Sequence, residues 1–154
     1  MQPSEPTATG AHPAANQFVR RPFPVLVVDD NEAERRLTAY HLDRAWPFER
    51  DLAVLQAADG REALAQLRRV RFALMLLDWS MPAMNGGEVL AELRRLGLRV
   101  PVVVVSGVER DQLPADFEQL GAAFLTKDNM NPDTLREAIR QSLQLLGFTK
   151  PQRG

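Results

Sequence analysis

The segment FALMLLDWSMP (residues 72–82) decides the predicted fold. In this segment an unbroken apolar run ends in one carboxylate, Asp78, and Met81-Pro82 then turns the chain away. A short run of this kind is typical of a strand buried on both faces in a parallel sheet. We therefore expect Asp78 at the carboxyl end of a central strand, where open α/β sheets place their functional groups. Taken alone, Asp78 could equally begin an ordinary turn.

Apolar segments and amphipathic segments alternate along the rest of the chain. Such alternation predicts an α/β fold, a three-layer, doubly wound parallel sheet of five strands with helices on both faces. The alternation alone does not give the order of the strands. Of the five predicted helices, the fourth, around residues 114–120, is the weakest. The strands are expected at residues 25–28, 52–58, 72–78, 100–105 and 122–126.

The first helix is predicted to begin after a cap at Asn31. Glu34, three residues later, is the expected capping-box partner of that residue. This helix is expected to have an apolar face that packs against the sheet. The predicted members of that face are Ala33, Leu37, Tyr40 and Ala45.

The beginning of the chain differs in composition from the rest. Residues 1–23 combine several prolines with small and polar residues and show almost no apolar periodicity. Such a segment cannot bury enough surface to offset the entropy lost on ordering. We expect a disordered N-terminal extension at 1–23, one domain at 24–148 and a short C-terminal tail at 149–154, with no effector domain. A partner-binding arm is the alternative for the extension.

Composition disfavours several classes of function. The chain has no cysteine, which excludes disulfides, thiol catalysis and thiolate metal sites. Its net charge of -1 gives no electrostatic case for binding nucleic acid. No apolar stretch is long enough to span a membrane, and no signal peptide is recognisable. We therefore expect a cytoplasmic protein with no nucleic-acid or membrane partner.

Polar groups end four of the predicted strands. They are Asp29 with Asp30, Asp78, Ser106 and Lys127. Because the carboxyl ends of parallel strands lie along one edge of the sheet, we expect these side chains to converge. Three carboxylates then face one ammonium group, and the excess negative charge favours a bound divalent cation. Oxygen ligands without Cys or His favour Mg²⁺ over zinc.

A phosphoryl group is the natural second ligand of such a site. Mg²⁺ bridges readily to phosphoryl oxygens, while Ser106 can donate a hydrogen bond to them and Lys127 can offer a positive charge. The sequence has no Gly-rich phosphate loop of the Walker type, which argues against a bound nucleotide. Because a carboxylate can itself be the nucleophile, we predict that Asp78 forms an aspartyl-phosphate.

These motifs, in this order, resemble the receiver domain of two-component response regulators. The similarity extends from about Pro24 to Leu146. It comprises the acidic pair at 29–30, Asp-Trp-Ser-Met-Pro at 78–82 with Asn-Gly at 85–86, Ser-Gly at 106–107 and Phe-Leu-Thr-Lys at 124–127. The resemblance implies a flavodoxin-like strand order of 2-1-3-4-5.

The resemblance also implies a reaction. Asp78 would accept a phosphoryl group from a phosphohistidine on a sensor histidine kinase or a histidine phosphotransfer protein. Asp29 and Asp30, with Asp78 and the backbone carbonyl of Ser80, would hold Mg²⁺. The protein would signal to a downstream protein target and would not be an enzyme acting on a diffusible substrate, since it would promote only its own phosphorylation and dephosphorylation.

Signal output is implied to depend on two further residues. Ser106 would move toward the phosphoryl group, and Phe124 would follow it inward as a switch aromatic. The face formed by the fourth helix, the fifth strand and the fifth helix would carry the output, and a homodimer through that face is one option. Whether the protein is an output switch, a relay shuttle or a phosphate sink stays open.

Two features depart from the family pattern. Asp128 follows Lys127 where family members usually have proline, so the bond between them is expected to be trans or strained. The segment 121–127 is also one residue shorter than usual. A pseudo-receiver that binds partners without phosphorylation is therefore kept as an alternative. An aspartyl-phosphate hydrolase is a weaker one, because Ser80 stands where that class has a second Asp.

Overall fold

A computed structural model describes residues 21–49 and 51–147 of the chain. None of the helices in this part is both long enough and apolar enough to cross a membrane. The strands are β1 (Phe23–Val28), β2 (Leu52–Ala57), β3 (Leu74–Asp78), β4 (Val102–Ser106) and β5 (Ala123–Thr126). The helices are α3 (Glu32–Ala45), α4 (Gly60–Arg69), α5 (Gly86–Arg95) and α6 (Pro132–Leu145), and short 3-10 segments are η1 (Arg110–Gln112), η2 (Phe117–Leu120) and η3 (Lys127–Asn129).

The five strands form one parallel sheet in the order β2-β1-β3-β4-β5. This confirms the predicted fold class and the strand order that the resemblance implied. β3 is the central strand, and all of its residues are buried. In the register of the sheet Asp78 lies opposite Val105, one residue before the end of β4. Asp78 therefore stands in the middle of the carboxyl edge.

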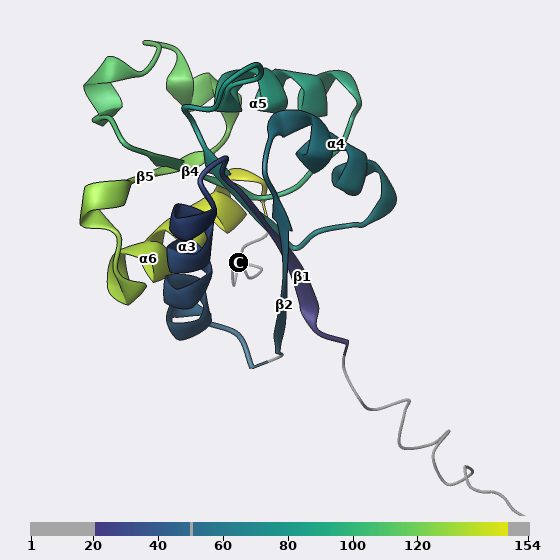
Figure 1. Ribbon diagram of the computed structural model, residues 1–154, viewed down its shortest axis with the longest axis vertical. Coiled ribbons are helices and arrows are strands. Elements are labelled where there is room, and N and C mark those ends of the chain that lie inside the picture. Colours follow the sequence, from purple (N-terminus) through teal and green to yellow (C-terminus); the bar gives the residue numbers. More distant parts are fainter. Residues whose placement is uncertain (1–20, 50, 148–154) are drawn as a thin grey trace, which may run out of the picture.

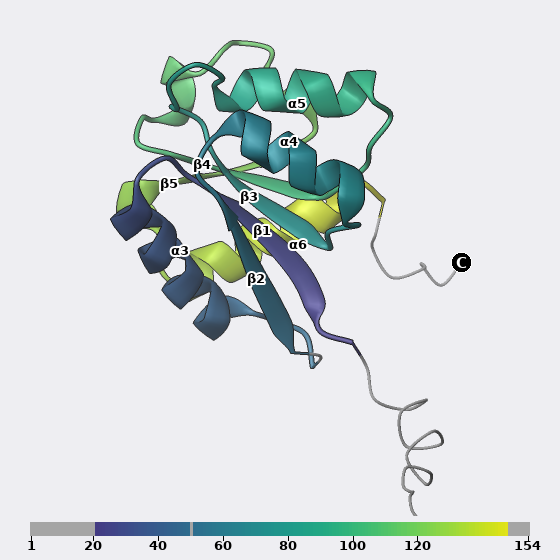
Figure 2. The same ribbon diagram turned by 45° about the vertical axis from the view of Figure 1, so that its right-hand side comes forward.

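The helices cover the sheet in two layers, α3 and α6 on one face and α4 and α5 on the other (Figures 1 and 2). Because successive residues of a strand point to opposite faces, each strand contributes to both cores. Leu76 packs in the core on the α3 and α6 side, whereas Met75 and Leu77 pack in the core beneath α4 and α5. This burial on both faces explains why the strands are continuously apolar.

The prediction of a helix around residues 114–120 is wrong. The chain there forms turns and the 3-10 segment η2, held by bonds such as that from the Phe117 N–H to the Pro114 carbonyl (3.0 Å). Pro114 and Gly121 bound a segment too short to offset the cost of nucleating an α-helix. Gly121 ends η2 with a φ of 75°, a conformation that favours glycine. The described residues thus contain four α-helices and not the predicted five.

The apolar face predicted for α3 is wrong except for Ala45, because the helix is rotated relative to the prediction. Its buried residues are Thr38, Leu42 and Ala45, whereas Leu37 and Tyr40 are 55% and 52% exposed. The rotation is set by packing against α6 and β1, and the stripe with Leu42 and Ala45 is the one that meets them. The more apolar stripe is left on the surface.

β1 begins one residue before the predicted domain boundary. Phe23 pairs with Leu52 in the sheet, and its ring packs edge-on against Trp46 and Phe48. Phe23 therefore belongs to the folded unit and not to an extension. Most of the predicted extension (residues 1–20) and the predicted tail (149–154) lie outside the described residues.

Candidate functional site

Three carboxylates meet at the carboxyl edge of the sheet. Asp29 and Asp30 directly follow β1, and Asp78 is the last residue of the neighbouring β3. One oxygen from each side chain lies within 4.8 Å of the others. Asp29 and Asp78 are buried, and Asp30 is exposed. This three-carboxylate cluster offers only oxygen ligands and has one side open to solvent, which suits Mg²⁺ with retained waters.

Lys127 brings a positive charge to the cluster from the end of β5. Its Nζ lies 3.1 Å from Asp29 Oδ2 and 3.5 Å from Asp78 Oδ1. It also donates a hydrogen bond to Glu34 Oε1, on the first turn of α3. The described residues contain no cis peptide bond, so the Lys127–Asp128 bond is trans and the chain continues directly into η3.

The crowding of charge and the burial of the site shift the pKa values of Asp78 and Lys127. Burial raises the pKa of Asp78 from its ordinary 3.8 to about 6; the charge of Asp29 adds to the rise, and Lys127 opposes it. Burial acts to lower the pKa of Lys127, but hydrogen bonds to Glu34 and Asp29 and the charge of Asp78 raise this pKa overall. At neutral pH Lys127 is therefore charged and Asp78 is mostly ionised.

Residue 29 is held in place from two neighbouring elements. The Oδ1 atom of Asp29 accepts a hydrogen bond from the Asn31 N–H (2.9 Å) at the start of α3. Its backbone carbonyl accepts one from Arg35 (2.7 Å), whose Nε also donates to Gln56 Oε1 (2.7 Å) on β2. The Asp29 carboxylate is thus oriented before any ligand binds.

The capping box predicted at Asn31 is only half formed. Asn31 Oδ1 accepts a hydrogen bond from the Glu34 N–H (2.9 Å), as predicted. The Asn31 N–H donates to Asp29 and not to Glu34, so the Glu34 carboxylate reaches Lys127 instead. Glu34 is a site residue that the sequence analysis missed, because capping is the expected use of a Glu at that position.

The loop after β3 depends on Gly86. Its N–H donates to the Trp79 carbonyl (2.9 Å), and a Cβ at this position would approach the Asp78 carbonyl oxygen to 3.0 Å. The loop also brings the N–H of the exposed Ser80 to Asp78 Oδ1 (3.3 Å). Residue 80 therefore stays beside the Asp78 carboxylate, while the ligand role of its carbonyl stays a prediction.

Ser106 is the last residue of β4, the strand next to β3, whereas Phe124 lies within β5. Ser106 is fully buried, and its Oγ accepts a hydrogen bond from the Val108 N–H (3.0 Å). Phe124 is half-buried, and its ring packs edge-on against Phe117 with 5.8 Å between ring centroids. Phe117 packs in the same way against Trp79 at 5.6 Å. A row of three aromatic rings thus connects the residue after Asp78 to Phe124, a connection that the sequence analysis missed.

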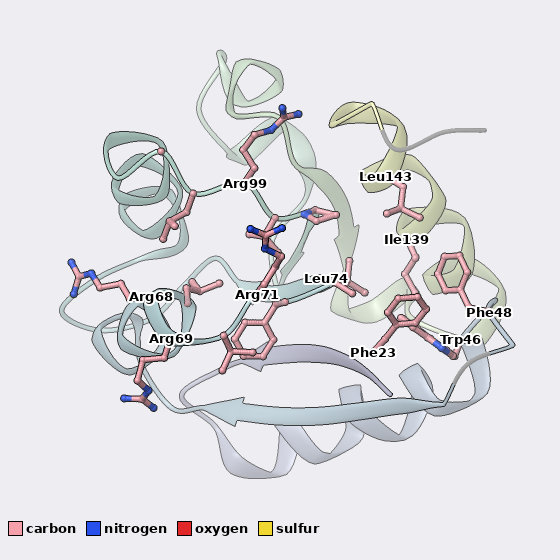
Figure 3. Close-up of a pocket in the computed structure, with 18 residues that line it drawn as sticks. Phe23, Trp46, Phe48, Arg68, Arg69, Arg71, Leu74, Arg99, Ile139 and Leu143 are labelled. Carbon is pink, nitrogen blue, oxygen red and sulfur yellow. The ribbon is translucent and has the colours of Figure 1, made fainter. Parts of the chain in front are cut away.

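A large cavity lies at the opposite edge of the sheet. Its volume is about 910 Å³, and Phe23, Trp46 and Phe48 gather on one side of it, across from Arg71 and Arg99 (Figure 3). None of the predicted site residues lines it. The candidate site is therefore placed by its chemistry, at the acidic edge, and not by the size of a cavity.

The fold and the site together define a class of protein. A doubly wound sheet with the order 2-1-3-4-5 and its charged groups at the carboxyl edge is typical of flavodoxin-like α/β proteins. The sequence matches the response regulator receiver domain family over residues 25–140. This chain belongs to that family, as its motifs indicated.

Two relatives of the chain are longer proteins. The chain is 35% identical over 131 residues to a protein-glutamate methylesterase/protein-glutamine glutaminase of Treponema denticola, a match that covers 80% of this chain and 34% of that protein. It is 31% identical over 129 residues to the response regulator GacA of Pseudomonas aeruginosa, with 83% and 58% covered. The chain thus spans about a third of the first relative and somewhat more than half of the second.

Solved structures of receiver domains share the fold. Chemotaxis response regulator CheY4 of Vibrio cholerae is similar with 29% identity and a TM-score of 0.66, over 80% of this chain and all of that one. A response regulator receiver protein from Pseudomonas putida is similar with 28% identity and a TM-score of 0.63, over 80% and 99%. Receiver domains are signalling domains of two-component systems, and phosphorylation and Mg²⁺ binding are typical of them.

Proposed function

We propose that this protein is a phosphoacceptor switch, in which Asp78 takes a phosphoryl group from a histidine kinase or a histidine phosphotransfer protein. The reaction depends on Mg²⁺, and the phosphorylated protein signals by contact with a downstream protein. The observation that carries the proposal is the approach of Lys127 Nζ to Asp29 and Asp78 within the three-carboxylate cluster.

Asp78 has the position and the charge that the nucleophile requires. An ionised Oδ of Asp78 attacks the phosphorus of the phosphohistidine; a P–O bond forms as the P–N bond breaks, and the electron pair of that bond leaves on the imidazole nitrogen. With a pKa of about 6, Asp78 is mostly ionised at neutral pH. No general base is needed to prepare it.

The entering phosphoryl group adds negative charge to a cluster that already has it in excess. Bound Mg²⁺ would supply most of the neutralising charge. Lys127 would pair with one phosphoryl oxygen, and the Ser106 hydroxyl would donate to another from the neighbouring strand. The ligands assigned to Mg²⁺ are Asp29, Asp30, Asp78 and the backbone carbonyl of Ser80.

An exposed apolar strip on α3 favours docking of the phosphodonor at this helix. α3 begins beside the three-carboxylate cluster, and Leu37 and Tyr40 are exposed along it. A partner that carries a phosphohistidine must bind within reach of Asp78, and large exposed apolar side chains are typical of protein contacts. We assign Leu37 and Tyr40 to this docking surface.

The output is assigned to the opposite side of the site. Ser106 and Phe124 would respond to the phosphoryl group, and η2, β5 and α6 would form the face that the target contacts. Because an α-helix is replaced by η2 there, this face differs from the one that the resemblance implied. A homodimer through this face, the C-terminal domain limit at 148 and a location in the cytoplasm stay predictions.

The test is phosphorylation by a small-molecule donor. Purified protein is incubated with acetyl phosphate in Mg²⁺ or in EDTA and analysed by intact mass. One added phosphoryl group is expected in Mg²⁺ and none in EDTA, and Asp78→Asn is expected to abolish the addition. Asp43→Asn, which removes an exposed carboxylate from α3, is the matched control and should behave as the wild type.

Two other results would point elsewhere. A wild-type protein that gains no phosphoryl group in Mg²⁺ would refute the proposal and favour a pseudo-receiver that binds partners without phosphorylation. Steady turnover of a small phosphate ester would favour the aspartyl-phosphate hydrolase.

A further inference from the structure

Glu34 holds Lys127 from outside the three-carboxylate cluster. Among the described residues it is the one carboxylate that contacts Lys127 without belonging to that cluster. Its side chain is 47% exposed, against 24% for Lys127 and 3% for Asp78. Glu34 therefore lies at the mouth of the site and binds the lysine from the solvent side.

The local structure explains why the Glu34 carboxylate is available for this contact. A Glu three residues after an Asn cap ordinarily accepts a hydrogen bond from the N–H of the cap residue. Here the Asn31 N–H is already bonded to Asp29 Oδ1. Asp29 thus takes the place of Glu34 in the cap, and the Glu34 side chain extends to Lys127.

The directions of the Lys127 hydrogen bonds suit a role in phosphoryl transfer. An ammonium group has three N–H donors. One of them meets Glu34 and another meets Asp29, which leaves the third for the side of Asp78, whose Oδ1 is 3.5 Å away. The third donor therefore faces the carboxylate that would carry the phosphoryl group.

The contact with Glu34 gains importance when a cation binds. A divalent ion in the cluster would compete for the oxygens of Asp29 and would repel the Lys127 ammonium. Glu34 does not belong to the cluster, so its bond to Lys127 is the one that such an ion does not compete for directly. Without Glu34, the only carboxylates within 4 Å of the Lys127 ammonium among the described residues would be Asp29 and Asp78, and both belong to the cluster that would hold the ion.

We propose that Glu34 is a positioning residue for phosphoryl transfer, which orients the Lys127 ammonium toward the Asp78 position while a metal ion engages Asp29. This inference rests on the proposed function, because the orientation matters for transfer only if Asp78 is phosphorylated. It predicts that loss of Glu34 slows transfer at saturating Mg²⁺ and leaves the affinity for Mg²⁺ nearly unchanged.

The experiment measures the rate of phosphorylation of the full chain by acetyl phosphate at saturating Mg²⁺, from intact mass against time. Glu34→Ala is expected to be about three- to tenfold slower than the wild type, as for loss of one partly exposed hydrogen bond between charged groups. Glu34→Gln keeps an acceptor oxygen but no charge, so its rate should lie between the two.

Glu32→Gln is the matched control. Glu32 lies on the same first turn of α3, but its carboxylate pairs with Arg36 at 2.9 Å and not with Lys127. The substitution removes the same charge from the same end of the helix but leaves the bond between Glu34 and Lys127 in place. A wild-type rate is therefore expected. A slow Glu32→Gln variant would show that charge at the helix end, and not the bond to Lys127, sets the rate, and would overturn the inference.

Two further measurements separate positioning from a merely structural role. The Kd for Mg²⁺, from Trp79 fluorescence in a Trp46→Phe background, should be the same with and without Glu34. A double-mutant cycle with Glu34→Gln and Lys127→Gln should give a coupling in the free energy of unfolding. A Glu34 that acted only on helix stability would give no such coupling.

The outcomes distinguish this inference from the proposed function. If the wild type is phosphorylated and Glu34→Ala is phosphorylated at the same rate or faster, the role of Glu34 is overturned and the proposed function stands. A wild type that takes up no phosphoryl group overturns the proposed function itself.

Discussion

The ammonium group of Lys127 donates a hydrogen bond to the carboxylate of Glu34, a residue 93 positions earlier in the chain. The bond joins the end of β5 to the first turn of α3 across the carboxyl edge of the sheet. The same Nζ atom lies 3.1 Å from Asp29 Oδ2 and 3.5 Å from Asp78 Oδ1. One side chain thereby links the three segments that carry the charged groups, which makes its surroundings the most informative place to test.

Asp78→Asn is expected to stabilise the metal-free protein at neutral pH. The pKa of Asp78 is raised from 3.8 to about 6, so its ionisation above that pH costs free energy in the folded state. At about 1.4 kcal/mol for each pKa unit, the gain at pH 7 has an upper limit of about 3 kcal/mol. Urea unfolding in EDTA measures it, with Asp43→Asn as the control.

The pH dependence of that gain has a definite sign. A folded-state pKa above the unfolded one means that the folded protein binds the proton more tightly, so Asp78 lowers stability as the pH rises from 3.8 through about 6. The difference between Asp78→Asn and the wild type should therefore grow over this window and level off above it. A difference that is constant with pH would contradict the raised pKa.

Lys127→Met is expected to destabilise the metal-free protein by about 2 kcal/mol, because it leaves buried carboxylates without their cation. The variant should regain more stability than the wild type when Mg²⁺ is added, since a more negative cluster attracts the ion more strongly. Urea unfolding with and without Mg²⁺ measures both effects. Arg61→Met, which removes an exposed positive charge from α4, should show neither.

Gly86→Ala is expected to destabilise the protein by about 1–2 kcal/mol, because its Cβ would press on the backbone of the loop after β3. The nearest atoms would be the Asp78 carbonyl oxygen and the Trp79 Cα, both at 3.0 Å. Gly107→Ala is the control, since a Cβ there meets no atom within 4 Å. Thermal unfolding compares the two; equal stability would show that the loop moves aside without cost.

Phe117→Ala is expected to destabilise the protein by about 3–5 kcal/mol, as for other buried aromatic residues. Phe117 is 2% exposed and lies between the rings of Trp79 and Phe124. Its loss should also shift the fluorescence of Trp79, measured in a Trp46→Phe background. Phe48→Ala, at a residue that is 40% exposed, should cost less and leave the Trp79 spectrum unchanged.

The site residues near strand ends were predictable from the sequence because their placement follows from topology. Once the apolar runs before Asp29 and Asp78 are recognised as parallel strands, both residues must lie at one edge of the sheet. Contacts within that edge depend on side-chain competition. Glu34 contacts Lys127 because the Asn31 N–H is already bonded to Asp29. The spacing of these residues along the chain does not show which carboxylate will accept that hydrogen bond.

The rotation of α3 likewise could not be predicted from the spacing of residues along the chain. Its sequence contains two stripes that could face the sheet, and the one with Leu37 and Tyr40 has the larger apolar side chains. The structure buries the stripe with Leu42, because α6 and β1 leave room for it. Hydrophobic periodicity indicated a helix but not which of its two faces would be covered.

By itself the sequence determined the alternation of strands and helices, the family and the edge at which the charged groups lie, since each of these follows from local patterns along the chain. Only the tertiary structure decided the rotation of α3, the replacement of a helix by η2 and the partners of Lys127. These features depend on free-energy differences between competing contacts, and such contacts form only when distant segments are packed together.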